Sequence, residues 1–266
     1  MKRCRIKELH ESPHCPQCWR DGLTNFLSFF VIHTGVYRQA VPFVDDLLRQ
    51  SGENRIVDLC SGNGSYMLRF LTLLKKLDPG RDVHAILTDR YPGRISTMEI
   101  AKLKKGNVRY FPEALDAMDA LHKLPGLHVM FSAIHHFDEE GLTALLKTAC
   151  DDSRPVAFFD YSKRNLPAEI LPLMLVPLLI LLVAPLIRPF SWRQLFFIYI
   201  IPAIPILVMV DGFISRLRSY NCLELRKIIE NLGDLPDYHW QTGKFNSLLG
   251  LCTVHFITGA QRNKMN

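Results

Sequence analysis

The spacing of apolar residues predicts a helical start to the chain and an alternation of strands and helices after it. Between residues 26 and 48 apolar residues recur with helical spacing, which predicts two helices within an N-terminal cap. From Arg55 onward, short apolar runs alternate with longer periodic segments, as in a parallel sheet whose strands are joined by helices. The expected strands are 56–59, 84–88, 108–111, 127–133, 155–159 and 251–257, and the expected helices are 65–76, 94–105, 138–150 and 223–232.

A strongly apolar segment interrupts this alternation after the fifth expected strand. Residues 170–187 and 195–210 contain no charged residue, and the link between them carries Arg188 and Arg193. Both runs fall slightly short of the roughly 20 residues that cross a bilayer as a helix. Because an apolar surface of this size is unfavourable in water, we expect the segment to associate with a membrane.

The position of this segment limits how it can meet a membrane. Strands on both sides of it belong to one sheet, so the chain must return to the side from which it left. It can do so as a two-pass hairpin or as broken helices that lie in the membrane plane, and the two arginines of the link favour the second. Basic residues beside the segment place the α/β domain in the cytoplasm, namely Lys163, Arg164, Arg216 and Arg218.

Domain organisation and composition follow from these patterns. We divide the chain into a helical cap (1–52), an α/β domain (53–162 and 211–266) and an apolar membrane-associated insertion (163–210). The formal net charge of +6 permits anionic partners, but no dense basic region with interleaved aromatic residues suggests nucleic-acid binding. The seven cysteines are an odd number, and residues 1–5 lack an apolar stretch, so we expect reduced thiols in the cytoplasm.

Two local patterns could carry chemistry. Cys15 and Cys18 lack the second cysteine pair of a zinc site, and although His10 and His14 could complete the four ligands, the sequence favours no metal centre. The stronger pattern is Arg55-Ile-Val-Asp-Leu-Cys-Ser-Gly-Asn-Gly-Ser65, in which an expected strand ends in an acid and a glycine turn opens a helix. Gly62 and Gly64 allow a tight turn and a close approach of a ligand to the backbone. The turn does not match a nicotinamide-cofactor fingerprint, because the position of its third glycine is Met67.

The turn and three later segments resemble the motifs of the class I methyltransferases that use S-adenosylmethionine. The resemblance implies an α/β, doubly wound, mostly parallel seven-stranded sheet, with an N-terminal helical cap and an apolar helical-hairpin insertion after strand five. It departs from the family at Cys60, where the family has its first glycine. The cofactor-binding residues that it implies are Asp58, Ser61, Gly62, Gly64, Asp89 for the ribose, and Asp116 or Glu113 for the adenine amino group.

The segment after the fourth expected strand supplies the candidate catalytic residues. In the resemblance, Phe131–Phe137 faces the transferred methyl group, and His135 or His136 is suited to take a proton from the acceptor. The expected reaction is O- or N-methylation of a small, lipophilic or membrane-resident acceptor, because the apolar insertion occupies the position that shapes the acceptor pocket in this family. The alternatives are a catalytically inactive, cofactor-binding membrane scaffold and, less favoured, a nicotinamide-dependent oxidoreductase.

Overall fold

The computed structural model describes residues 3–93, 98, 100, 106–161, 166–233, 237–248 and 252–261. A seven-stranded sheet with the order β3-β2-β1-β4-β5-β7-β6 forms its centre, and β7 runs antiparallel to the other six strands. This confirms the expected α/β, mostly parallel methyltransferase-type sheet. The strands are β1 (Arg55–Leu59), β2 (His84–Leu87), β3 (Val108–Tyr110), β4 (Leu127–Phe131), β5 (Val156–Tyr161), β6 (Tyr238–Ser247) and β7 (Cys252–Gln261).

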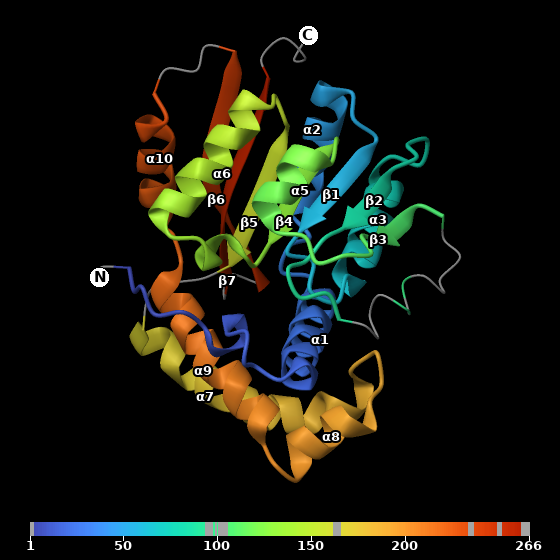
Figure 1. Cartoon of the computed structure of the whole chain (residues 1–266), viewed down its shortest axis with the longest axis vertical. Helices are drawn as coiled ribbons and strands as arrows, with labels where there is room; N and C mark the ends of the chain where they lie inside the picture. Colours follow the sequence, from blue (N-terminus) through green and yellow to red (C-terminus); the bar gives the residue numbers. More distant parts are fainter. Residues whose placement is uncertain are drawn as a thin grey trace.

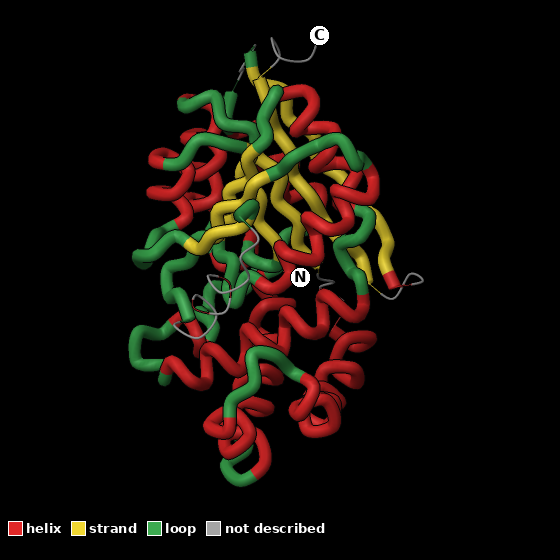
Figure 2. The backbone as a smooth tube through the Cα atoms, turned by 90° about the vertical axis from the view of Figure 1, so that its right-hand side faces the viewer, coloured by secondary structure: helices red, strands yellow, loops and turns green. Residues whose placement is uncertain are grey.

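Helices cover both faces of the sheet, which is why the central strands are apolar along their whole length (Figures 1 and 2). On one face, α2 (Ala40–Ser51) and α3 (Ser65–Leu77) pack against the sheet through one buried cluster. On the other, α5 (Ala117–Lys123), α6 (Glu139–Asp151) and α10 (Cys222–Asn231) pack through a second cluster. Short 3₁₀ helices are η1 (Leu9–Glu11), η2 (Ile134–His136) and η3 (Ala184–Leu186).

Two elements of the α/β domain, β6 and α5, were not expected from the sequence. The sequence pattern gave no strand at β6, because its burial alternates and most of its residues are polar, as is usual for an edge strand. The short helix α5 was also not expected, and its N-cap is Asp116, whose side chain accepts a hydrogen bond from the amide of Met118. The expected helix 94–105 lies outside the described residues, except for positions 98 and 100.

The apolar insertion forms three helices at the end of the sheet toward which the parallel strands point (Figure 1). They are α7 (Leu166–Val183), α8 (Trp192–Tyr199) and α9 (Ala203–Arg218). Together with α1 (Gln17–Thr34), they bury a third apolar cluster that includes Phe26, Ile180 and Val208. In the described part of the chain, no single helix is long and apolar enough to cross a membrane, whereas α8 and α9 meet the length and composition test only as a pair bent by 75°.

Helix α9 connects the apolar helices to the rest of the protein. It runs without a break across residue 211, where the sequence pattern had placed the end of the insertion. Its first half contributes Ile204 and Val208 to the cluster with α1, and its second half carries the buried side chains of Asp211 and Arg218. One helix therefore fixes the position of the apolar segment relative to the strand ends, where the candidate site lies.

Candidate functional site

The turn between β1 and α3 holds the acid and the glycines that the sequence singled out. Asp58 is the second-last residue of β1 and is buried, and the backbone then turns through left-handed conformations at Cys60, Gly62 and Gly64, with φ angles of 57°, 57° and 71°. Gly64 also has no room for a side chain, because an added Cβ would lie 2.4 Å from Leu87 of β2. The turn therefore depends on glycine at position 64 for packing as well as for conformation.

Asp89 ties the end of β2 to this turn. Its Oδ2 accepts a hydrogen bond from the amide of Gly62 at 2.8 Å, and its Oδ1 accepts one from the amide of Tyr91 at 2.7 Å. Ser61 reinforces the connection, since its hydroxyl donates to the carbonyl of Asp58 at 2.7 Å and its amide donates to the carbonyl of Thr88. Each carboxylate oxygen of Asp89 keeps a second lone pair with which it can bind a ligand hydroxyl.

Burial raises the pKa of both acids in this part of the site. The pKa of Asp58 rises to about 7, because the carboxyl is desolvated and Asp89 adds negative charge, while a hydrogen bond with Ser61 acts in the opposite direction. The pKa of Asp89 is also raised by burial, against the lowering effect of its two backbone hydrogen bonds. Two buried acids that repel each other form a site that favours a positively charged ligand group.

The left-handed conformation of Cys60 gives a direct stability prediction. A side chain in this conformation costs about 1–2 kcal/mol, and glycine in its place costs about 0.5–1 kcal/mol of additional backbone entropy. We therefore expect Cys60→Gly to raise the free energy of unfolding by about 0.5–1 kcal/mol in urea titrations. Cys150→Gly, within α6, should lower it by about 1 kcal/mol, and a loss at both positions would contradict this account.

A buried asparagine that the sequence analysis passed over fixes the turn to the N-terminal cap. The side-chain amide of Asn63 donates to Asn25 of α1 at 2.9 Å, and its oxygen accepts bonds from the hydroxyl of Ser28 and the amide of Ser65. Asn63 is 2% exposed. A polar residue between two glycines gave no signal in the sequence, because its partners lie 38 and 35 positions away in α1.

A cavity of about 1180 Å³ lies beside the turn, at the carboxyl ends of β1 and β4. The strand order reverses between these two strands, and ligands of open α/β sheets bind at this crevice. Of the expected cofactor residues, Gly64 lies away from the cavity lining, as does Glu113 among the two candidates for the adenine. Those that line the cavity are Asp58, Ser61, Gly62, Asp89 and Asp116, and both His135 and His136 line it as well.

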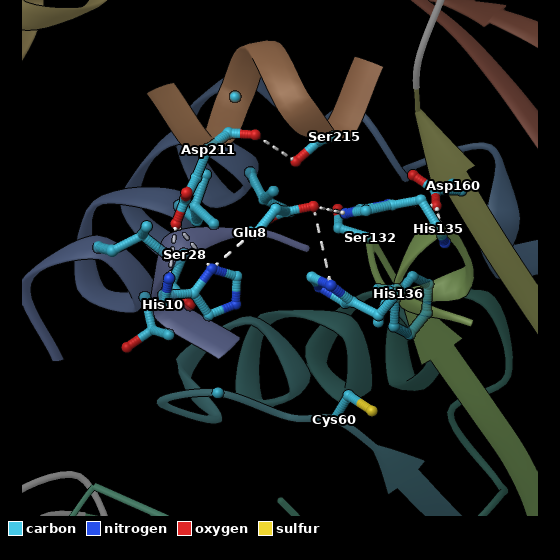
Figure 3. A pocket seen from close by; sticks show the side chains of 18 of the residues that line it. Glu8, His10, Ser28, Cys60, Ser132, His135, His136, Asp160, Asp211 and Ser215 are labelled. Atoms are coloured by element: carbon cyan, nitrogen blue, oxygen red, sulfur yellow. Dashed lines mark hydrogen bonds and ion pairs between the residues drawn. The ribbon is translucent and has the colours of Figure 1, made fainter. Parts of the chain in front are cut away.

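His135 lies between two carboxylates (Figure 3). Its Nδ1 is 2.6 Å from Oδ2 of Asp160, at the end of β5, and its Nε2 is 3.4 Å from Oε1 of Glu8. Burial lowers the pKa of His135, but the charges of Asp160 and Glu8 outweigh it and raise the pKa to about 10. His135 is therefore a cation at neutral pH, which makes it a structural charge and unsuitable as a proton acceptor.

The pKa of His136 shifts in the opposite direction to that of His135, although the two residues are adjacent. Its Nδ1 is 2.8 Å from Oε1 of Glu11, and the same carboxylate receives a hydrogen bond from the guanidinium of Arg218. Burial and the positive charge of His135 lower the pKa of His136, despite the nearby Glu8 and Glu11. With Nδ1–H donating to Glu11, the neutral ring leaves Nε2 with a free electron pair. The geometry thus separates the two histidines that the sequence left equivalent.

The N-terminal segment supplies site residues that the sequence analysis did not find. Glu8 and Glu11 reach the two histidines, and Arg3 donates from its guanidinium to the carbonyl of His135 at 3.0 Å. Asp211 of α9 holds the segment in place, since its carboxylate accepts bonds from the amides of residues 9 and 10 at 2.6 and 3.0 Å. The only signal in the sequence was a cluster of charged residues before the first helix.

Three of these side chains could also offer ligands to a metal ion. Glu8, His10 and His136 each place a ligand atom within 4.8 Å of those of the other two. All three already have partners of their own, because His10 bonds to Asp211 at 2.9 Å, His136 bonds to Glu11, and Glu8 pairs with His135. Hydrogen bonds and ion pairs within the protein account for the cluster, so we describe it as a polar network.

Comparison with known proteins concerns the fold. No protein-family model and no curated protein matches the sequence. Similar solved structures include an O-methyltransferase family protein from Burkholderia thailandensis, with 12% identity over 89% of this chain and 59% of that chain and a TM-score of 0.49. The magnesium protoporphyrin IX methyltransferase from Synechocystis PCC 6803 with bound SAH has 12% identity over 84% and 83% of the two chains and a TM-score of 0.44.

Human N-acetylserotonin methyltransferase, in complex with SAM, is also similar, with 14% identity over 91% of this chain and 55% of that chain and a TM-score of 0.47. The chain thus spans 59% and 55% of the length of the Burkholderia and human proteins.

Proposed function

We propose that the protein transfers a methyl group from S-adenosylmethionine to a lipophilic acceptor that carries a nucleophilic oxygen or nitrogen. One observation carries the proposal. Three carboxylates, those of Asp58, Asp89 and Asp116, line one end of a cavity that continues past His136 into an apolar arm. The two ends of this cavity have the chemistry of a cationic nucleoside and of an apolar acceptor, respectively.

The chemistry of the acidic end fits the proposed methyl donor. Asp58 is a buried carboxyl with a raised pKa, which an ammonium or sulfonium group would stabilise as the carboxylate. Asp89 has lone pairs for two adjacent ribose hydroxyls, and Asp116 lines the cavity where it can accept from an amino group. S-adenosylmethionine supplies an activated methyl group on a positively charged sulfur.

The protein's own residues would position the acceptor and remove its proton. His136 Nε2 would accept the proton of an acceptor hydroxyl as the oxygen forms its bond to the methyl carbon. The electron pair of the broken carbon–sulfur bond remains on sulfur, so the nucleoside product is S-adenosylhomocysteine. Glu11 would hold the imidazole in the tautomer that this step needs, and Arg218 would keep Glu11 ionised. Such base catalysis typically contributes about 10²–10⁴-fold to a rate.

The apolar arm supports a lipophilic acceptor. On one side it is lined by buried side chains of α1, Leu23 and Phe26, and on the other by Leu173 and Val176 of α7 and Val208 of α9. An apolar chain or ring would gain from burial against these side chains. The polar end of the acceptor would then lie at His136.

Cofactor binding at different pH values tests this proposal. Below pH 7 the Asp58 carboxyl is mostly protonated, so the ammonium group of S-adenosylhomocysteine can pair with it only after that proton has left. We therefore expect calorimetry to show binding that is about tenfold weaker at pH 6 than at pH 8. The neighbouring Cys60, Tyr66 and Tyr110 remain neutral over this range, because burial raises the pKa of each. Their protonation therefore leaves the expected profile unchanged, while Asp89 adds to it in the same direction.

Asp58→Asn is the matched control, because it should bind weakly at both pH values. Methyl transfer to a lipid extract then separates an enzyme from a scaffold, since a scaffold would bind the nucleoside without turnover. An absence of binding by the wild-type protein at pH 8 would overturn the proposed function.

A further inference from the structure

Helices α7, α8 and α9 expose most of the large apolar side chains that lie at the surface of the described residues. Leu182 of α7 and Trp192 of α8 are each 78% exposed, and Leu171, Leu178 and Ile200 are between 62% and 69% exposed. Soluble monomers rarely expose contiguous apolar patches larger than a few hundred Å². We call these side chains the apolar surface of α7–α9. Its contact with water is unfavourable.

The opposite side of the same helices is fixed to the protein. Ile180 of α7 and Ile204 and Val208 of α9 are buried in a cluster with Leu23 and Phe26 of α1. Figure 2 shows these helices as a layer beside the end of the sheet. Because the inner side of this layer is buried, the exposed side chains of the apolar surface lie on its outer side. A helix with one side packed on protein and the other exposed and apolar is suited to lie in the plane of a lipid surface.

The charges and aromatic residues around the apolar surface favour a membrane with anionic lipids. The sequence has no acidic residue between positions 170 and 210, and its charged residues there are Arg188 and Arg193, both exposed. Trp192 lies between them in sequence, and tryptophan is enriched where a membrane meets water. Arginines close to the membrane surface attract the negative headgroups of anionic lipids.

The cavity reaches the apolar surface. Leu175 and Leu179 of α7 line the cavity and are also 51% and 39% exposed, whereas Leu173, on the inner side of α7, is 5% exposed. The apolar arm thus extends from the surface of α7 to His136 at the site. An amphiphile that moved along this arm would keep its apolar part out of water throughout.

We propose that the apolar surface of α7–α9 binds in the plane of a bilayer that contains anionic lipids, and that the acceptor enters the cavity from the leaflet beside Leu175 and Leu179. The second part rests on the proposed function, and the first does not. The acceptor class that follows is an amphiphile whose polar end carries the methylated oxygen or nitrogen and whose apolar part remains close to the lipid.

Vesicle flotation with the full chain tests this inference. We expect the protein to float with phosphatidylcholine vesicles and to float more completely when they contain phosphatidylglycerol. A double variant, Leu178→Asp with Leu182→Asp, should weaken the partition by about tenfold or more, because each leucine loses its burial in lipid. Arg188→Gln with Arg193→Gln should remove the preference for phosphatidylglycerol. The matched control is Leu77→Asp on α3, where the leucine is 51% exposed on another side of the protein.

The possible outcomes are distinguishable. Failure of the wild-type protein to float, or an equal loss in the Leu77 control, would overturn the inference. So would a stable dimer that Leu178→Asp with Leu182→Asp converts to monomer, since the surface would then be an interface between copies of the chain. Thermal unfolding serves as the folding check for every variant, and calorimetry with S-adenosylhomocysteine is measured separately. Vesicle binding without nucleoside binding would confirm that the apolar surface binds lipid and would overturn the proposed function.

Discussion

Replacement of His136 by asparagine is expected to lower the rate of methyl transfer by about 10²–10⁴-fold and to leave the affinity for S-adenosylhomocysteine unchanged. Asparagine can keep the hydrogen bond to Glu11, but it has no basic nitrogen to accept a proton from the acceptor hydroxyl. The measurement is the transfer of a radiolabelled methyl group to a lipid extract, together with calorimetry of nucleoside binding.

A surface histidine and the neighbouring histidine provide the controls for this result. His122 lies in the last turn of α5, outside the residues that line the cavity, with its Nδ1 at 2.6 Å from Asp152, and His122→Asn should retain full activity. His135→Asn should destabilise the protein, because it leaves Asp160 and Glu8 buried without their cation. Full activity of His136→Asn, with intact nucleoside binding, would show that the acceptor needs no base.

Replacement of Asp89 by alanine is expected to weaken S-adenosylhomocysteine binding by about 100-fold or more. The variant would lack the two charge-assisted hydrogen bonds that the Asp89 carboxylate is expected to form with the ribose, each with a net contribution of about 1.5–3 kcal/mol. It would also release the amide of Gly62, which Asp89 holds at 2.8 Å, so that the turn itself is less well ordered. Calorimetry measures the affinity, and thermal unfolding shows whether the variant remains folded.

The matched control for Asp89 is an acid of the same type outside the cavity. Asp119 lies on the exposed side of α5 and pairs with Lys123 at 3.0 Å, so Asp119→Ala should bind the nucleoside with wild-type affinity. An exposed pair of this kind also contributes little to stability, and the variant should unfold at nearly the wild-type temperature. If a folded Asp89→Ala protein bound S-adenosylhomocysteine normally, the nucleoside would not occupy this part of the cavity.

The lack of charged residues after β5 predicted membrane association without fixing its geometry. The absence of charge in residues 170–187 and 195–210 identified an unusual segment, but it left a crossing hairpin and an in-plane arrangement open. The packing of Ile180 and Val208 against α1 assigns an inner and an outer side to these helices, and our proposal of an in-plane arrangement starts from that contact. That contact joins segments that lie far apart in the sequence, so the pattern of either segment alone gives no sign of it.

The sequence by itself determined the order of the first five strands, the turn at Asp58–Gly64 and the acids near the ends of β1 and β2. Periodicity and turn residues act over a few neighbouring positions, so a linear pattern records them. It did not determine the edge strand β6, whose polar residues respond to solvent on one side.

Only the tertiary structure decided which side chains share a charge environment. His135 and His136 are adjacent and chemically identical, yet Asp160 and Glu8 raise the pKa of the first, while burial and the charge of His135 lower the pKa of the second against the opposite effect of Glu11. Those carboxylates come from β5 and from the N-terminal segment, more than twenty and more than one hundred positions away. Electrostatic interactions depend on distance in space and on burial, and the order of residues in the chain gives neither quantity.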